Sequence, residues 1–403
     1  MNNHVIKERF LRDRQIIFFL LSTFLGAAAT GIFFGSLNNF LSDIYNISAS
    51  SRGFIETIRE LPGALLILLL APLSNIGERN ILIAATCLIA IGILGASSLA
   101  PGVIAVTFWL FVWSVGAHVV MTIRESFSVA LSTPVTRGKI FGIVRSLRSF
   151  GTIVGAIIIW IGMDHFGFGY DELYYLAAVI TLVSAVSVFF LKDQAHTAIH
   201  RKKFVFKKKY SLFYILAILF GVRKQIFLVF GPWVLIRIYN QSAPQMAKLL
   251  IISSAVGIAL KPILGRMIDK FGERIVLSFD AISLMIICGF YGLANKILPA
   301  YLVIPSLYAC YILDDSLFFL RSAHVTYLSK IVEGAEELTA CISTSFSLEH
   351  VVSMIAPAIA GIIWVKYGYP WVFFICAIVA LFMFITARLI PSKKQLEELN
   401  SGL

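Results

Sequence analysis

The chain of 403 residues is 59% hydrophobic and only 14% charged, and its mean hydropathy is +0.87. Soluble domains are typically about 45–50% apolar and about 25% charged, so this composition excludes an ordinary soluble protein and indicates a polytopic membrane protein. The formal net charge of +12 is concentrated in predicted loops, where it indicates membrane topology and contact with anionic lipid headgroups and not nucleic-acid binding.

Twelve segments are apolar and long enough to be membrane-spanning helices, which need about 20 residues each. The first follows a basic N-terminal stretch, and its length indicates a retained helix and not a cleaved signal peptide. The predicted fold class is therefore an all-α membrane protein. The predicted spans are 16–41, 53–75, 80–98, 103–131, 138–162, 170–191, 211–238, 245–268, 275–295, 299–328, 338–364 and 369–390.

A polar and basic connection at 192–210 separates the first six predicted spans from the last six. We therefore expect a six-helix bundle over residues 1–191, a linker over 192–210, a second six-helix bundle over 211–390 and a short tail over 391–403. Basic residues gather in the loops that share a side of the membrane with both ends of the chain. The positive-inside bias thus places both termini and the linker in the cytoplasm.

The five cysteines lie in or beside apolar runs and form no C-x-x-C pair, so neither disulfides nor a metal site is expected. The sequence also contains no P-loop, no H-E-x-x-H and no G-x-S-x-G pattern. We therefore predict no cofactor and no enzymatic activity, and we expect any transport to be driven by a gradient and not by ATP.

The segment 265–274, with the sequence GRMIDKFGER, joins two predicted spans. Asp269 is placed to cap the following helix or to pair with a base, and Gly272 is suited to the turn. The segment resembles the G-x-x-x-D-[RK]-x-G-[RK]-[RK] loop signature of the major facilitator superfamily, except that Glu273 stands where the family usually has a base. By this resemblance we expect gating roles for Gly265, Asp269, Lys270, Gly272 and Arg274.

Similar segments recur at corresponding places in the two halves of the chain. Arg124 and Arg321 occupy equivalent positions in the fourth and tenth spans, and the fifth and eleventh spans both end in Ile-Ile-Trp, at Trp160 and Trp364. The segment 71–79 corresponds to the 265–274 loop, with an asparagine in place of the carboxylate. This is the parallel repeat that the resemblance implies, in which two six-helix bundles rock about a central site.

Charged residues within predicted spans are costly in lipid, so they usually face a bundle interior or an aqueous cavity. Arg223 and Lys224 lie about a dozen residues into the seventh span, roughly 18 Å of rise, which is too deep for easy snorkelling. We expect at least one of them to meet the substrate, with a fixed carboxylate partner as the alternative. Arg145 and Arg148 share one face of the fifth span and suit an oxyanion, with snorkelling as the alternative. The candidate substrate-binding residues are Arg223, Lys224, Arg145, Arg148, His118, Asn38 and Asn39.

Four titratable residues lie near the middle of the tenth and eleventh spans: Asp314, Asp315, Glu349 and His350. A lone buried carboxylate tends to hold a proton near neutrality, whereas one that is paired with a fixed cation stays ionised. We therefore consider these four residues as candidates for proton coupling, with static ion pairs and a structural histidine as the alternatives.

Further charged residues are candidates for gates. Arg124, Glu125 and Arg321 lie toward the cytoplasmic ends of their spans, and we expect the arginines to pair with Glu125 or with acids elsewhere in the bundle. Glu60 lies at helical spacing from Glu56, just before a Pro-Gly pair that can kink the second span. We expect an outer gate there, with an exposed charged first turn as the alternative.

Together these observations predict a secondary active transporter of a small organic solute, anionic and proton-coupled, in a bacterial cytoplasmic membrane. We expect a monomer that contacts membrane lipids and does not bind nucleic acid. Efflux of a drug or another amphipathic compound is the alternative, although the fifth span lacks the G-P-x-x-G-G run of many drug antiporters in the family. A non-transporting membrane sensor is less favoured, because the tail after residue 390 is short.

Overall fold

The computed structural model describes residues 14–133, 135–193, 205–392 and 395, and in these residues the secondary structure is helical with no strand. Eleven helices are long and apolar enough to cross a membrane, judged by length and composition. The prediction of an all-helical protein is confirmed. The basic N-terminal stretch and most of the short tail lie outside the described residues.

The second predicted span, 53–75, is helical but not one continuous helix. Its first part carries three charged residues, a proline lies inside the helix at Pro62, and a turn at Leu65 separates the first piece from the second. The pieces are α3 (Ala49–Ala64), α4 (Leu66–Leu70) and η1 (Ala71–Leu73). Because this segment is not among the eleven helices, the count of twelve spans stays a prediction.

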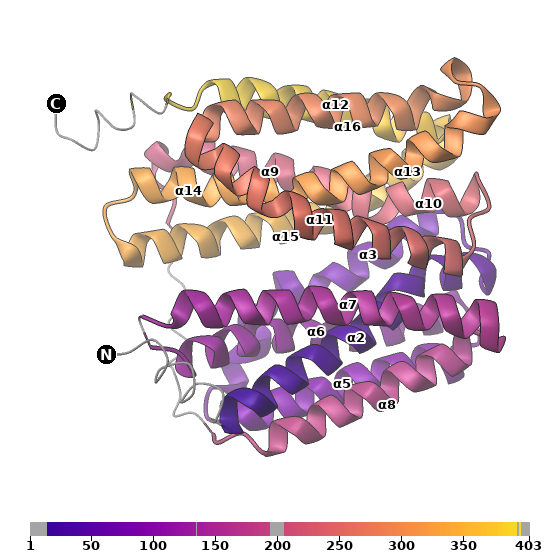
Figure 1. Cartoon of the computed structure of the whole chain (residues 1–403), viewed down its shortest axis with the longest axis vertical. Helices are drawn as coiled ribbons and strands as arrows, with labels where there is room; N and C mark the ends of the chain where they lie inside the picture. The colour runs from indigo at the N-terminus through magenta and orange to yellow at the C-terminus, as the bar shows by residue number, and fades with distance from the viewer. Residues whose placement is uncertain (1–13, 134, 194–204, 393–394, 396–403) are drawn as a thin grey trace. The chain divides into compact units, whose positions relative to one another are not determined.

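The helices group into two compact units, and the first contains residues 14–45, 61–193 and 242–251. In it α2 packs against α7 and α8, and α5 packs against α6 and α8 (Figure 1). Glycines allow the close approach of α2 and α7, since a Cβ on Gly155 would lie 2.4 Å from the carbonyl oxygen of Ala28. The long helices of this unit are α2 (Arg14–Asp43), α5 (Glu78–Ser98), α6 (Val103–Ala130), α7 (Arg137–Phe166) and α8 (Tyr170–Phe189).

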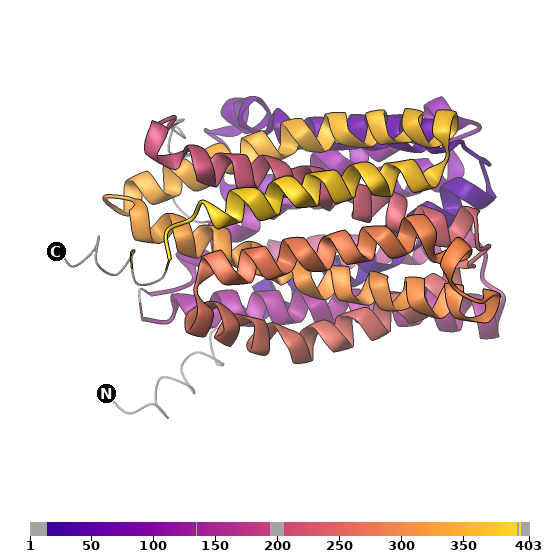
Figure 2. The same cartoon turned by 90° about the horizontal axis from the view of Figure 1, so that it is seen from above.

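The second unit contains residues 46–60, 205–241 and 252–395. Its α12 and α16 run side by side, which both views show (Figure 1, Figure 2), and α9 packs against α15 and α16. Residues 46–60 come from the first predicted bundle, and residues 242–251 of the first unit come from the second. The helices are η2 (Lys208–Tyr210), α9 (Ser211–Gln225), η3 (Ile226–Phe230), α10 (Gly231–Arg237), α11 (Ala243–Phe271), α12 (Glu273–Ile297), α13 (Ala300–Leu317), η4 (Phe318–Arg321), α14 (Ser322–Ile331), α15 (Ala335–Tyr367) and α16 (Tyr369–Arg388).

Two irregular turns interrupt the long helices of the second unit beside charged residues. The π-helical turn η3 follows directly after Arg223 and Lys224, and the 3₁₀ turn η4 ends at Arg321. Irregular helical turns of this kind are frequent at functional sites. They change the directions of the flanking side chains from those that a regular α-helix would give.

The end of the linker binds to the second unit. The backbone N–H of Val205 donates to the Thr344 hydroxyl at 3.2 Å, and Lys209 Nζ lies 2.5 Å from Glu333 Oε1. The hydrogen bond from Lys209 holds the pKa of the Glu333 carboxyl below its usual range. The middle of the linker, 194–204, lies outside the described residues.

Candidate functional site

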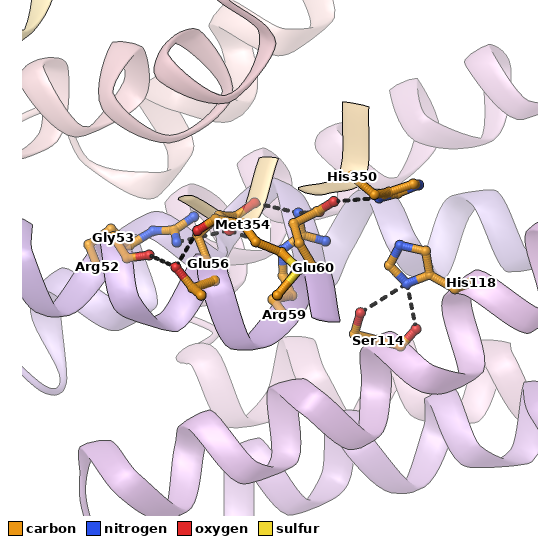
Figure 3. Close-up of polar contacts among 10 residues, drawn as sticks. Arg52, Gly53, Glu56, Arg59, Glu60, Ser114, His118, His350 and Met354 are labelled. Carbon is orange, nitrogen blue, oxygen red and sulfur yellow. Dashed lines mark hydrogen bonds and ion pairs between the residues drawn. The ribbon is translucent and has the colours of Figure 1, made fainter. Parts of the chain in front are cut away.

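A chain of four buried charges runs along α3. Arg52 Nη1 lies 3.0 Å from Glu56 Oε2, the Arg59 Nε donates to the same oxygen at 3.0 Å, and Arg59 Nη2 bridges Glu56 and Glu60 (Figure 3). All four side chains are buried. The spacing of three and four residues puts them on one helix face, and their alternating signs sum to zero. The charged turn is therefore enclosed in protein and is not the exposed first turn of a helix.

Helix α3 packs closely against α15 through residues next to these charges. The Thr57 hydroxyl donates to the carbonyl oxygen of Met354 at 2.6 Å. A Cβ on Gly53 would lie 2.2 Å from the carbonyl oxygen of Pro357, and one on Gly361 would lie 2.5 Å from that of Ala49. Glycines on both helices thus permit backbone contact between segments that lie about 300 residues apart in the sequence, as the separation of 297 between Thr57 and Met354 shows.

Glu60 joins α3 to a titratable residue of α15. His350 Nδ1 lies 3.1 Å from Glu60 Oε2 (Figure 3). Lys224 on α9 also acts on the Glu60 carboxylate electrostatically, although no ion pair of Lys224 occurs among the described residues. The structure therefore brings together Glu60, predicted as a gate, and His350, predicted for proton coupling.

Arg223 is fully buried and is held by two carboxylates. Its Nη1 lies 2.6 Å from Asp280 Oδ2 on α12, and its Nη2 lies 3.0 Å from Asp314 Oδ1 on α13. Its Nε also donates to Asp314 Oδ1 at 3.3 Å. Of the two alternatives for this residue, the geometry is that of a fixed ion pair, and the guanidinium uses three donors on it.

A second ion pair joins Arg321 to α15. Its Nη2 contacts both oxygens of Glu349, at 2.7 and 2.8 Å, and the guanidinium lies over the ring of Phe346, 4.8 Å from the ring centroid. Asp315, by contrast, accepts a hydrogen bond from the Ser253 hydroxyl at 2.5 Å. The predicted proton-coupling residues thus fall into two groups: Asp314 and Glu349 contact arginines, whereas Asp315 contacts a serine and His350 contacts Glu60.

In the first unit, Arg124 reaches from α6 to α2. Its Nη2 donates to the carbonyl oxygen of Ser22 at 3.0 Å and lies 3.5 Å from the hydroxyls of Ser22 and Ser184. In the described part of the chain it has no carboxylate partner, and the adjacent Glu125 is exposed. The expected pairing of Arg124 with Glu125 is therefore absent from this geometry, because neighbouring residues point about 100° apart around a helix.

The other predicted substrate-binding residues of the first unit differ in exposure. Arg145 and Arg148 on α7 are exposed. His118 on α6 is buried, and its Nδ1 lies 3.0 Å from the Ser114 hydroxyl and 2.9 Å from the Ser114 carbonyl oxygen (Figure 3). On α2, Asn39 is buried and Asn38 is partly buried.

The 265–274 segment is mostly helical and is shorter as a turn than its sequence suggests. Helix α11 continues to Phe271 and α12 begins at Glu273, so Gly272 alone makes the turn, with φ +78°. Asp269, Lys270 and Arg274 therefore lie on helix ends, and the N-cap of α12 is Gly272 and not Asp269. Gly265 makes no close approach, because a Cβ there would meet only Phe319, at 3.9 Å.

Sequence reasoning missed two acids that begin helices at matching places of the repeat. Glu273, noted only as a departure from the loop signature, is buried and lies 2.6 Å from Lys330 Nζ. Glu78, the first residue of α5, is buried, and the Ser126 hydroxyl donates to its carboxylate, with Oγ 2.8 and 2.9 Å from the two carboxylate oxygens. An acid in the first turn of a helix is stabilised by the helix dipole, and this position is the sequence feature that could have identified both residues. Asp280 was also missed, although a buried Arg223 requires an acid.

Comparisons with known proteins agree on one fold. The sequence profile described as Major Facilitator Superfamily matches residues 19–319 and 213–402. A point-mutant form of the nucleoside transporter NupG superposes with a TM-score of 0.76 at 13% identity, covering 93% of this chain and 99% of that chain. A D-xylose-proton symporter superposes with a TM-score of 0.68 at 16% identity, covering 95% and 98%. No curated protein sequence matched the chain.

Proposed function

Because the chain belongs to the Major Facilitator Superfamily, we propose that it is a secondary active transporter that moves a small organic solute by alternating access, coupled to protons. The family and the apolar helices make it a multi-pass integral membrane protein of a transporter family, not an enzyme. The absence of a P-loop from the sequence supports a gradient as the energy source.

The contact between α3 and α15 carries this proposal. The two helices come from opposite halves of the chain, and they meet through backbone contact at Gly53, the Thr57–Met354 hydrogen bond and the Glu60–His350 contact. In alternating access, the two halves separate at one end while they meet at the other. We propose that this contact is a gate that opens and closes once in each cycle.

Glu60 and His350 are the proposed coupling residues. Imidazole is the side chain that changes charge between pH 5 and 8, and a charged donor strengthens a hydrogen bond to a carboxylate. Protonated His350 would therefore hold α3 on α15, and loss of the proton would weaken the contact. Arg59 and Lys224 act electrostatically on the same carboxylate. Asp315, which accepts a hydrogen bond from Ser253 and has no ion pair among the described residues, is the second candidate.

An anionic solute is the finer part of the proposal. Because Arg223 is held by two carboxylates, it does not support an anionic solute. The support for an anion comes from Lys224 and from the exposed Arg145 and Arg148. The neighbours named above are a transporter of nucleosides and a symporter of D-xylose, so a small polar solute without charge is the competing class.

Proton movement in proteoliposomes tests the coupling. Liposomes that contain the purified protein and a trapped pH-sensitive dye are supplied with succinate, inorganic phosphate, a nucleoside or D-xylose. We expect an anion to produce solute-dependent proton movement. A signal from the nucleoside or the sugar, with none from the anions, would refute the anionic class, and no signal from any solute would count against proton coupling.

Two histidine variants, one at the proposed gate and one control, distinguish a role in the gate from a general effect on transport. His350→Gln should abolish solute-dependent proton movement, whereas His165→Gln, at an exposed site in the last turn of α7, should leave it unchanged. Equal activity of both variants would remove His350 from the mechanism.

We also propose that both termini and the linker face the cytoplasm of a bacterial cell and that the protein acts as a monomer. A single cysteine at Thr197, in a background without the native cysteines, should be labelled by an impermeant reagent only after the cells are opened. Labelling from outside intact cells would reverse the proposed orientation.

A further inference from the structure

Equivalent arginines in the two units have partners of different charge. Arg321 in the second unit contacts both oxygens of Glu349. Within the described residues, Arg124, its equivalent in the repeat, hydrogen-bonds only to neutral oxygens, those of Ser22 and Ser184. Its Nε is buried without a hydrogen-bond partner, so most of its donors are unused in the described part of the chain.

The repeat explains why Arg124 has no acidic partner among the described residues. Arg145 stands as many positions before Trp160 as Glu349 stands before Trp364, in helices that both end in Ile-Ile-Trp. The place that supplies the carboxylate in one unit thus supplies a second cation in the other. Arg148, one turn further along α7, is the charged group that acts on the Arg124 guanidinium electrostatically, and it is also cationic.

From this charge inversion we propose that Arg124 and Arg148 form a binding site for an oxyanion, a carboxylate or phosphate group, on the inner side of the first unit. Two guanidinium groups without an acid repel each other, and an oxyanion between them would accept the unused N–H donors. The guanidinium of Arg124 lies over Gly26, where a Cβ would be 2.6 Å from Nη2, so the glycine leaves room for this side chain.

The depth of the site favours a solute over a lipid headgroup. Arg124 is six residues from the end of α6 and Arg148 is eleven residues from the start of α7. These spacings correspond to roughly 9 and 16 Å of helix rise, whereas lipid phosphates lie at the membrane surface. The inference deepens the proposed function by placing the anion, and it rests on that function only for the claim that this anion is transported.

A test without any ligand compares the two arginines. Arg321→Gln leaves Glu349 without its partner and should lower the melting temperature of the purified protein. Arg124→Gln removes a cation that has no acidic partner in the described part of the chain, so it should leave the melting temperature unchanged or raise it. A loss at Arg124 as large as the loss at Arg321 would overturn the proposal, because it would reveal a fixed acidic partner.

A second test measures binding. Inorganic phosphate or succinate, compared with chloride at equal ionic strength, should raise the melting temperature of the wild-type protein. Their affinity should fall about 10- to 150-fold in Arg148→Gln, which changes an exposed residue, and in Arg124→Gln. Arg137→Gln, an exposed arginine at the start of α7, is the control and should bind as the wild type does.

Further arms identify the source of the anion. Phosphatidylglycerol is added to delipidated protein, with phosphatidylethanolamine as the comparison. Stabilisation by phosphatidylglycerol alone, lost in Arg148→Gln, would support the oxyanion site but assign it to lipid. No effect of phosphate, succinate or phosphatidylglycerol on the wild type would overturn the site. Transport of a nucleoside or sugar by that same protein would show that the proposed function survives.

Discussion

Replacing Arg223 by glutamine should destabilise the protein strongly. The substitution leaves Asp280 and Asp314 buried next to each other without their shared cation. Removing one partner of a buried ion pair costs about 3–5 kcal/mol, which lowers the folding equilibrium constant roughly 10²- to 4 × 10³-fold. The loss should cost more at Asp280 than at Asp314, because Asp280 Oδ1 already has no hydrogen-bond partner in the described part of the chain.

Thermal unfolding followed with a thiol-reactive dye measures this effect, since four of the five cysteines are buried and become reactive on unfolding. Lys224→Gln is the matched control, because it also replaces a basic residue by glutamine, at the next position. Lys224 has no ion pair among the described residues. We expect Lys224→Gln to melt close to the wild type and to weaken anion binding if this lysine meets the substrate.

A neutral triple variant separates the effect of unpaired buried charge from the loss of the arginine side chain. Arg223→Leu together with Asp280→Asn and Asp314→Asn removes every charge of the network, and it should recover much of the stability that Arg223→Gln loses, because no charge is left buried without a partner. If Arg223→Gln melts with the wild type, the ion-pair network is not what holds α9, α12 and α13 together, and this reasoning is wrong.

Three further predictions concern other parts of the chain. Gly53→Ala should lower the melting temperature by overpacking α3 against α15, at a cost of about 1–3 kcal/mol, whereas Gly289→Ala, with nothing within 4 Å of its Cβ, should not. Because the pKa of Glu333 is lowered by Lys209, their contact stabilises above the ordinary pKa of the acid and is lost as the pH falls through the lowered value. The protection of the amides at 205–210 against hydrogen exchange, taken relative to the intrinsic exchange rate at each pH, should therefore fall in acid, and a pH-independent protection factor would contradict this. Asp269→Asn should reduce transport while ligand affinity stays within a factor of about three, or ~0.6 kcal/mol; unchanged transport would argue against a gating role for this loop.

The sequence by itself determined the class of the protein. Apolar runs of membrane-spanning length predicted an all-helical membrane protein, and the 265–274 segment predicted the family; both predictions are confirmed. These signals are local, because hydropathy and turn residues are read within a window of neighbouring positions. The same local pattern also placed Arg223 deep in a span, where its charge requires a carboxylate partner or a bound anion.

Only the tertiary structure decided which charges meet. The partners of Arg223 lie 57 and 91 residues further along the chain, and His350 lies 290 residues from Glu60. No local pattern specifies such pairs, because they depend on how helices pack and on which face each one turns inward. The same holds for Arg124 and Arg321, which look alike in sequence. In the part of the chain that the structure describes, packing gives Arg321 the Glu349 carboxylate and gives Arg124 only neutral oxygens, because the partner of each arginine comes from a neighbouring helix.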